Sequence, residues 1–225
     1  MSFKRALRSV GNRQPPVFYY ITDRHSLAVP NEASLLRRIR KIIAWGVDFI
    51  QIREKDMPDR RLFNLTRSVV EMARKTPKAS HCRVLVNGRA DIAVAAGADG
   101  VHLTSSGIRI SDIRAWIPKN FIVGVSVHTM CEIRAAGADG SDYVLLGHVF
   151  PTASKEGMGT PLGVDFLRRA CIGSSVPVLC LGGMTAERAP AVLQAGAAGI
   201  AGISLFQNDD EFSCLGEKFR GRGSL

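Results

Sequence analysis

Cysteine and long apolar runs are scarce in this chain. Its 225 residues include five cysteines, an odd number without C-x-x-C spacing, so we expect reduced thiols and no disulfide framework. No apolar run approaches the ~20 residues of a membrane-spanning helix, and the first residues lack the apolar core of a secretory signal. These absences predict a cytoplasmic protein that does not enter a membrane.

Acidic residues are also outnumbered, with 20 Asp and Glu against 30 Lys and Arg, a formal net charge of +10. The excess is spread over predicted helix faces such as 37–41 and is not interleaved with aromatic residues, which is typical of a solvated surface. Nucleic acid is therefore not an expected partner. Residues 1–16 carry no acidic side chain and are predicted to form a basic arm, followed by one domain over 17–220 and a tail over 221–225.

Glycine, by contrast, is abundant and regularly placed. Gly46, Gly97, Gly137 and Gly196 each end a helical stretch directly before an apolar strand, where a left-handed C-cap costs glycine no steric penalty. Eight strand candidates alternate with amphipathic stretches, and they cover residues 17–22, 48–53, 83–86, 100–103, 122–126, 143–146, 177–181 and 199–204. This alternation predicts an α/β fold, a single (β/α)₈ TIM barrel whose site lies at the C-terminal ends of the strands.

The second and third strands end in polar side chains. Strand alternation would direct Gln51, Arg53 and Lys55 together toward the barrel mouth, where two cations and an amide can bind phosphate or carboxylate. A surface run of salt bridges is the alternative interpretation of the same residues. Asn87 follows the third strand and could both donate and accept hydrogen bonds there, although Asn-Gly is also a common turn signal.

The fifth strand ends with Ser126 and His128, which share the inward parity of the strand. A histidine at this position can exchange protons near neutral pH. The alternative is that His128 only caps a helix or satisfies a polar group. Its neighbours at the other strand ends favour a catalytic role.

The last three strands end in residues that suit an anion. The loop after the sixth strand carries Thr152, Ser154 and Lys155 among glycines, which predicts a lid that closes on an anionic ligand. Glycine pairs and helix N-termini after the seventh and eighth strands of a barrel commonly bind phosphate. The predicted phosphate-binding residues are Gly182, Gly183, Ile203 and Ser204.

Six of these motifs occur in the order typical of one family. They are Gln51–Lys55, Asn87–Arg89, Gly97–Leu103, Gly124–Thr129, Gly147–Lys155 and Leu181–Thr185. Together they resemble the thiamin phosphate synthase and thiazole tautomerase (TenI) superfamily. The resemblance implies a (β/α)₈ fold, a role in thiamin biosynthesis and a thiazole phosphate bound near Thr152, Ser154, Gly183, Ile203 and Ser204. It also allows a homodimer.

The two activities of this superfamily differ in their need for metal. The resemblance implies that synthases hold Mg²⁺ through two aspartates, at positions that here read Gly88 and Gly107. Both carboxylates are missing, so we predict an isomerase, a thiazole tautomerase that needs no cofactor or metal. In this prediction His128 moves a proton on a carboxythiazole phosphate while Arg53 and Lys55 hold its carboxylate.

Two alternatives remain open at this point. Gln51, Arg53, Lys55 and the Thr152 loop also suit a thiamin phosphate synthase, which would join hydroxymethylpyrimidine diphosphate to thiazole phosphate with Mg²⁺. A noncatalytic phosphate-binding or regulatory relative would keep the pocket without turnover.

Overall fold

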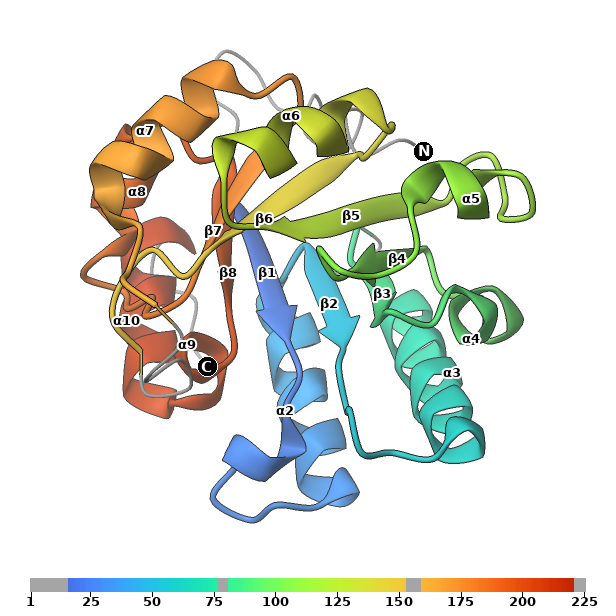
Figure 1. Cartoon of the computed structure of the whole chain (residues 1–225). Coiled ribbons are helices and arrows are strands. Elements are labelled where there is room, and N and C mark those ends of the chain that lie inside the picture. Colours follow the sequence, from blue (N-terminus) through green and yellow to red (C-terminus); the bar gives the residue numbers. More distant parts are fainter. Residues whose placement is uncertain (1–15, 77–80, 153–158, 221–225) are drawn as a thin grey trace.

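Eight parallel strands close into one barrel in the computed structural model, which describes residues 16–76, 81–152 and 159–220. The strands pair in chain order, and β1 also pairs with β8 to complete the ring (Figure 1). Their bounds are β1 Val17–Ile21, β2 Phe49–Ile52, β3 Arg83–Asn87, β4 Gly100–Leu103, β5 Ile122–Val127, β6 Tyr143–Gly147, β7 Val178–Leu181 and β8 Gly199–Gly202. The predicted (β/α)₈ barrel is confirmed.

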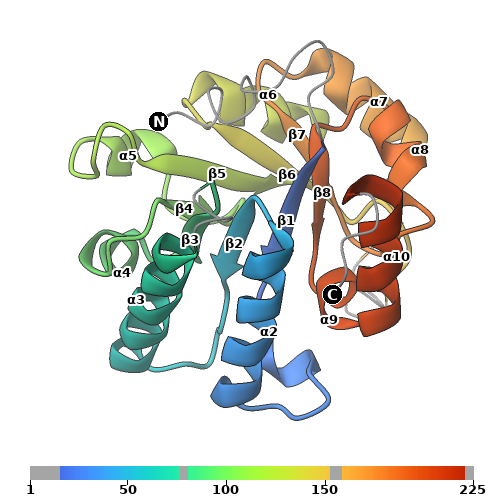
Figure 2. The same cartoon turned by 180° about the vertical axis from the view of Figure 1, so that it is seen from behind.

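Helices surround the strands in both views (Figure 1 and Figure 2). They are the 3₁₀ helix η1 Arg24–Ser26 and the α-helices α2 Glu32–Trp45, α3 Asp59–Lys75, α4 Ala90–Ala95, α5 Ile110–Arg114, α6 Met130–Ala138, α7 Gly163–Gly173, α8 Ala189–Gln194, α9 Ser204–Gln207 and α10 Asp209–Arg220. Among the described residues, none of these helices is long and apolar enough to cross a membrane. Most of the predicted arm and the predicted tail lie outside the described residues.

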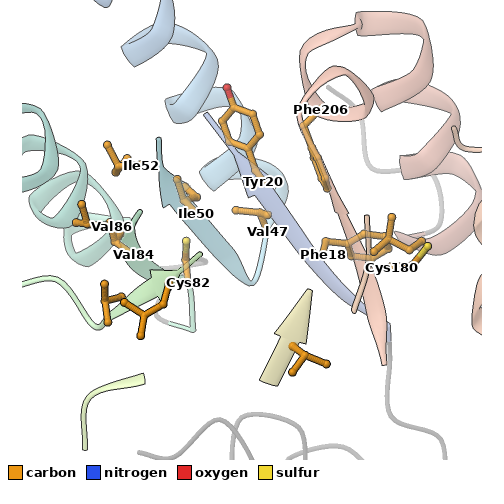
Figure 3. Packing of buried hydrophobic residues seen from close by; sticks show 14 of the residues in the cluster. Phe18, Tyr20, Val47, Ile50, Ile52, Cys82, Val84, Val86, Cys180 and Phe206 are labelled. Carbon is orange, nitrogen blue, oxygen red and sulfur yellow. The ribbon is translucent and has the colours of Figure 1, made fainter. Parts of the chain in front are cut away.

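Apolar side chains on both faces of each strand explain why the strands read as almost continuous hydrophobic runs. The outward residues, such as Ile50 and Ile52 of β2 and Val84 and Val86 of β3, pack beneath the helices (Figure 3). The inward residues form a separate cluster inside the barrel, consisting of Val17, Tyr19, Ile21, Phe49, Leu85, Ile122, Tyr143, Leu145, Leu179 and Ala201. Strand alternation therefore decides which side chains can reach the mouth from within.

Glycine ends the helices as predicted at three of the four joints. Gly46, Gly97 and Gly196 have positive φ angles of 97°, 71° and 100°. The third joint differs, because α6 continues through Gly137 and the positive φ of 84° falls on Gly140. At Gly137 a Cβ would lie 2.3 Å from Ser175 Oγ, so this glycine allows close packing and does not cap the helix.

The C-terminal end of β8 also differs from the sequence prediction. The strand stops at Gly202, two residues before the expected end, and Ser204 starts the short helix α9. The helix α10 then follows and covers residues Asp209–Arg220. Ser204 therefore lies in the first turn of a helix and not in a strand. This turn follows β8, the strand that pairs with β7.

Candidate active site at the barrel mouth

Polar side chains from six strands meet inside the barrel and form one continuous hydrogen-bonded chain. It begins at Asn87, runs through the barrel interior and ends at Ser126. Its five hydrogen bonds are Asn87 Oδ1 with Gln51 Nε2 (2.8 Å), Gln51 Oε1 with Tyr19 OH (3.0 Å), Tyr19 OH with Tyr143 OH (2.8 Å), Tyr143 OH with His102 Nδ1 (3.0 Å) and His102 Nε2 with Ser126 Oγ (2.9 Å). The two ends are half-buried and the four central residues are buried.

Burial keeps the central groups of this chain uncharged. Desolvation, followed by the positive charge of Arg53, lowers the pKa of His102 to about 3. Desolvation also raises the pKa of both tyrosine hydroxyls, Tyr19 and Tyr143, far above the ordinary value. At neutral pH the chain is therefore made of neutral donors and acceptors.

The three residues predicted to bind an anion together at the end of β2, Gln51, Arg53 and Lys55, have different environments in the structure. Gln51 is 1% exposed and uses both atoms of its amide within the chain, so it holds Asn87 in place. Arg53 lies at the mouth, close enough for its charge to act on His102. Lys55 stands in an exposed turn after the strand, where alternation no longer directs the side chain.

The opposite side of the mouth is built from backbone at the ends of β7 and β8. Gly182 and Gly183 have positive φ angles of 96° and 62°. A Cβ on Gly183 would lie 2.4 Å from the carbonyl oxygen of Pro151, because the loop after β6 passes directly over this glycine. Within the described part of the chain, the Gly183 N–H donates to no backbone carbonyl. Ile203 and Ser204 follow the neighbouring strand β8, so the four predicted phosphate-binding residues stand at adjacent strand ends.

An arginine that was not predicted from the sequence, Arg188, holds this glycine turn. The guanidinium of Arg188 donates to the carbonyl oxygen of Gly183 and lies 4.8 Å from the centre of the Phe150 ring. It thereby joins the turn after β7 to the loop after β6.

His128 directly follows β5, and Thr152, the first residue of the predicted lid, lies in the loop after β6. His128 is exposed, and its Nδ1 contacts the carbonyl oxygen of Gly147 at the end of the neighbouring strand. Its backbone N–H donates to Glu132 Oε2 at 2.6 Å, beside the capping box that starts α6. Thr152 is half-buried, whereas Ser154 and Lys155 lie outside the described residues.

Three residues of this site, His102, Tyr19 and Tyr143, were not predicted from the sequence. The signal that could have found them was their inward parity, combined with a polar group in an otherwise apolar strand. His102 lies two residues after Gly100 on β4 and faces into the barrel, like the other residues of the hydrogen-bonded chain. These three residues carry the buried part of the hydrogen-bonded chain.

The residues at the mouth do not fit the Mg²⁺ site that the resemblance implies for a synthase. Gly107 lines a pocket shared with Ser126 and Glu132, and Gly88 faces open space. Within residues 16–76, 81–152 and 159–220, no three His, Cys, Asp or Glu side chains are grouped so that they could hold a metal ion. The nearby Asp91 is paired with Arg89 at 2.7 Å.

Comparison with known proteins decides the family. The sequence model of a family described as thiamine monophosphate synthase matches residues 18–206. The chain belongs to this family. A putative thiamine-phosphate synthase of Geobacter sulfurreducens is 40% identical over 193 residues, covering 86% of this chain and 87% of that protein. A thiamine-phosphate synthase of Methanocella arvoryzae is 38% identical over 181 residues, covering 80% and 84%.

A solved relative of the thiamine monophosphate synthase family shares the barrel. The thiamine phosphate pyrophosphorylase of Pyrococcus furiosus superposes with a TM-score of 0.76 at 30% identity, covering 91% of this chain and 93% of that one. A 3-hexulose-6-phosphate synthase, with a TM-score of 0.66 and 20% identity, is similar in fold alone.

These relatives correct the predicted activity. The prediction of a thiazole tautomerase, an isomerase, is wrong, because the relative from Methanocella arvoryzae is named a thiamine-phosphate synthase and the relative from Geobacter sulfurreducens a putative one. Such synthases are transferases. That prediction relied on Gly88 and Gly107. Two missing carboxylates bear on metal binding, but they do not determine which bond the enzyme makes.

Proposed function

We propose that this chain is a thiamine-phosphate synthase, which joins hydroxymethylpyrimidine diphosphate to a thiazole phosphate and releases pyrophosphate. The observation that carries the proposal is that two kinds of anion-binding group face each other at the barrel mouth. One side has a cation and hydrogen-bonding side chains, and the other has strand ends lined by glycine. The chain is also 40% identical to a putative synthase. Two anionic substrates can occupy these two sides of one barrel mouth.

The thiazole phosphate belongs on the backbone side of the mouth. Gly182 and Gly183 bring the chain close enough for backbone N–H groups to donate to phosphate oxygens, and Ser204 begins a helix beside them. Arg188 supports this turn from the side away from the phosphate by binding the Gly183 carbonyl. No side chain of the turn itself needs to carry charge.

The diphosphate belongs near Arg53, with Lys55 and Thr152 at the edge of the mouth. The Arg53 backbone N–H is fixed by Thr22 Oγ1 at 2.9 Å, which holds the strand end from which this guanidinium projects. Its positive charge can stabilise the negative charge that accumulates on a departing pyrophosphate. Ser154 and Lys155, which the sequence also predicts to bind the anion, lie outside the described residues.

The proposed reaction is a displacement at carbon. The thiazole nitrogen forms a bond to the methylene carbon of the pyrimidine, and the bond from that carbon to the diphosphate oxygen breaks with its electron pair on the leaving group. No carbon-bound proton moves, so the proton shift assigned to His128 is no longer required. We propose instead that His128 positions the end of β6 through its contact with Gly147.

The test supplies both substrates to the full chain and measures thiamine phosphate and pyrophosphate together, with and without added Mg²⁺. We expect equal amounts of the two products, and a fall in kcat/KM of about tenfold or more for Arg53→Gln. Arg67→Gln is the matched control, because Arg67 lies on α3 against Phe63 and should leave kinetics unchanged. Binding of thiazole phosphate without any product would instead support a noncatalytic phosphate-binding relative.

A further inference from the structure

The hydrogen-bonded chain from Asn87 to Ser126 has a single direction, which follows from counting protons. Tyr19 donates its only hydroxyl proton to Gln51 Oε1. The 2.8 Å contact between the two tyrosine hydroxyls must then use the proton of Tyr143. Tyr143 can therefore meet the ring of His102 only as an acceptor, at 3.0 Å from Nδ1.

The same counting of protons determines the tautomer of His102 and the hydrogen-bond direction of Ser126. The histidine must carry its proton on Nδ1, since Nδ1 is the donor to Tyr143. Its low pKa, caused by burial, keeps the ring neutral, so Nε2 is an acceptor. Ser126 must then donate its hydroxyl proton inward to Nε2 across 2.9 Å.

We propose that Tyr19 and Tyr143 are positioning residues that orient the polar groups of the mouth through this chain. Ser126 is left with lone pairs directed away from His102, and Asn87, whose Oδ1 is occupied by Gln51, is left with its amide N–H groups. The mouth therefore presents an acceptor at Ser126 and a donor at Asn87, in a fixed arrangement.

Packing around Tyr143 holds the chain in this arrangement. Tyr143 pairs with Gly124 in the register of β5 and β6, and a Cβ on Gly124 would lie 2.0 Å from Tyr143 Cζ. The tyrosine ring thus occupies the space that a side chain on β5 would fill. Its hydroxyl lies within reach of both Tyr19 and His102, which are 2% exposed or less.

This polarity selects a ligand by chemistry. A ring that offers a hydrogen-bond donor toward Ser126 and an acceptor toward Asn87 matches the fixed groups, and an aminopyrimidine carries both. That part of the inference rests on the proposed function, whereas the protonation of His102 does not depend on it.

The experiment measures the tautomer of His102 by ¹⁵N NMR in the full chain. We expect a protonated Nδ1 and an unprotonated Nε2 in the parent. Tyr143→Phe removes the acceptor of Nδ1–H, so the proton should move wholly or partly to Nε2, where Ser126 can accept it. The matched control is Tyr20→Phe, because Tyr20 is equally buried but its hydroxyl accepts from Gln207 outside the barrel interior, at 3.0 Å. That variant should keep the parent tautomer.

A protonated Nε2 in the parent would overturn the proposal, even if Tyr143→Phe failed to fold. An unchanged tautomer in a folded Tyr143→Phe would do the same. With both substrates, we expect Tyr143→Phe to raise KM for the pyrimidine substrate about tenfold and leave KM for thiazole phosphate unchanged. An equal rise in both KM values would show a general loss of structure and contradict the positioning role. An inactive parent with protonated Nδ1 would reject the proposed function alone.

Discussion

Acid should destabilise this protein through His102. The ring is buried among neutral partners, and its pKa falls from 6.5 to about 3 on folding. In the unfolded chain the same ring is exposed and takes up a proton below about pH 6.5. Burial of His102 therefore has no pH-dependent effect on the free energy of unfolding above this pH. Below it, the free energy of unfolding falls progressively as the pH falls toward 3.

The size of the effect follows from the separation of the two pKa values. Each unit of pH below 6.5 favours the unfolded chain by about 1.4 kcal/mol while the folded ring stays neutral. Between about pH 7.5 and about pH 5 the loss is about 2 kcal/mol, a large share of the 5–15 kcal/mol typical of a domain.

The assay compares the free energy of unfolding of the parent and His102→Gln at both pH values, by urea titration. Carboxylates titrate equally in both proteins, so subtracting the two curves isolates the imidazole. We expect the parent to lose about 2 kcal/mol more than the variant. Parallel curves would refute the reasoning, because they would mean that the folded protein accepts a proton on His102 without cost. If the variant does not fold, an NMR titration of the parent decides, since the His102 ring should stay neutral at about pH 5.

The remaining predictions concern the two sides of the mouth and the metal. Gly183→Val should weaken binding of thiazole phosphate, measured by calorimetry, and also lower stability, because its Cβ would lie 2.4 Å from a backbone oxygen. The control is Gly140→Asn, at an open position with positive φ. Unchanged affinity of the Gly183 variant would place the phosphate elsewhere. His128→Asn should keep turnover within about tenfold of the parent, because an amide can still donate to the Gly147 carbonyl oxygen. His128→Ala should lose more turnover. A loss of about a hundredfold in the asparagine variant would show that the imidazole takes part in the chemistry. Gly88→Asp combined with Gly107→Asp should create Mg²⁺ binding that calorimetry detects and that the parent lacks. Aspartate tolerates the φ of 68° at Gly88 better than most residues do. Equally tight Mg²⁺ binding by the parent would contradict our interpretation of these two positions.

Much of the fold was determined by local properties of the sequence. Left-handed glycines such as Gly46 and Gly196 end helices because of their own backbone freedom, and apolar strands covered on both faces identify a parallel sheet without knowledge of its partners. Strand parity also predicted that Ser126 faces the barrel interior, where its hydroxyl contacts His102. These inferences depend only on neighbours along the chain, so they hold before the barrel closes.

The polar interior was decided by tertiary structure. Tyr19 and Tyr143 are separated by 124 positions in the sequence, and their hydroxyls meet only because closure of the barrel brings inward side chains of non-adjacent strands together. Gln51 looked like an anion ligand because its chemistry allows that role, and only the structure showed that both ends of its amide are used inside the protein. A residue's type limits the hydrogen bonds that it can make, but the three-dimensional arrangement of its partners decides which of them it does make.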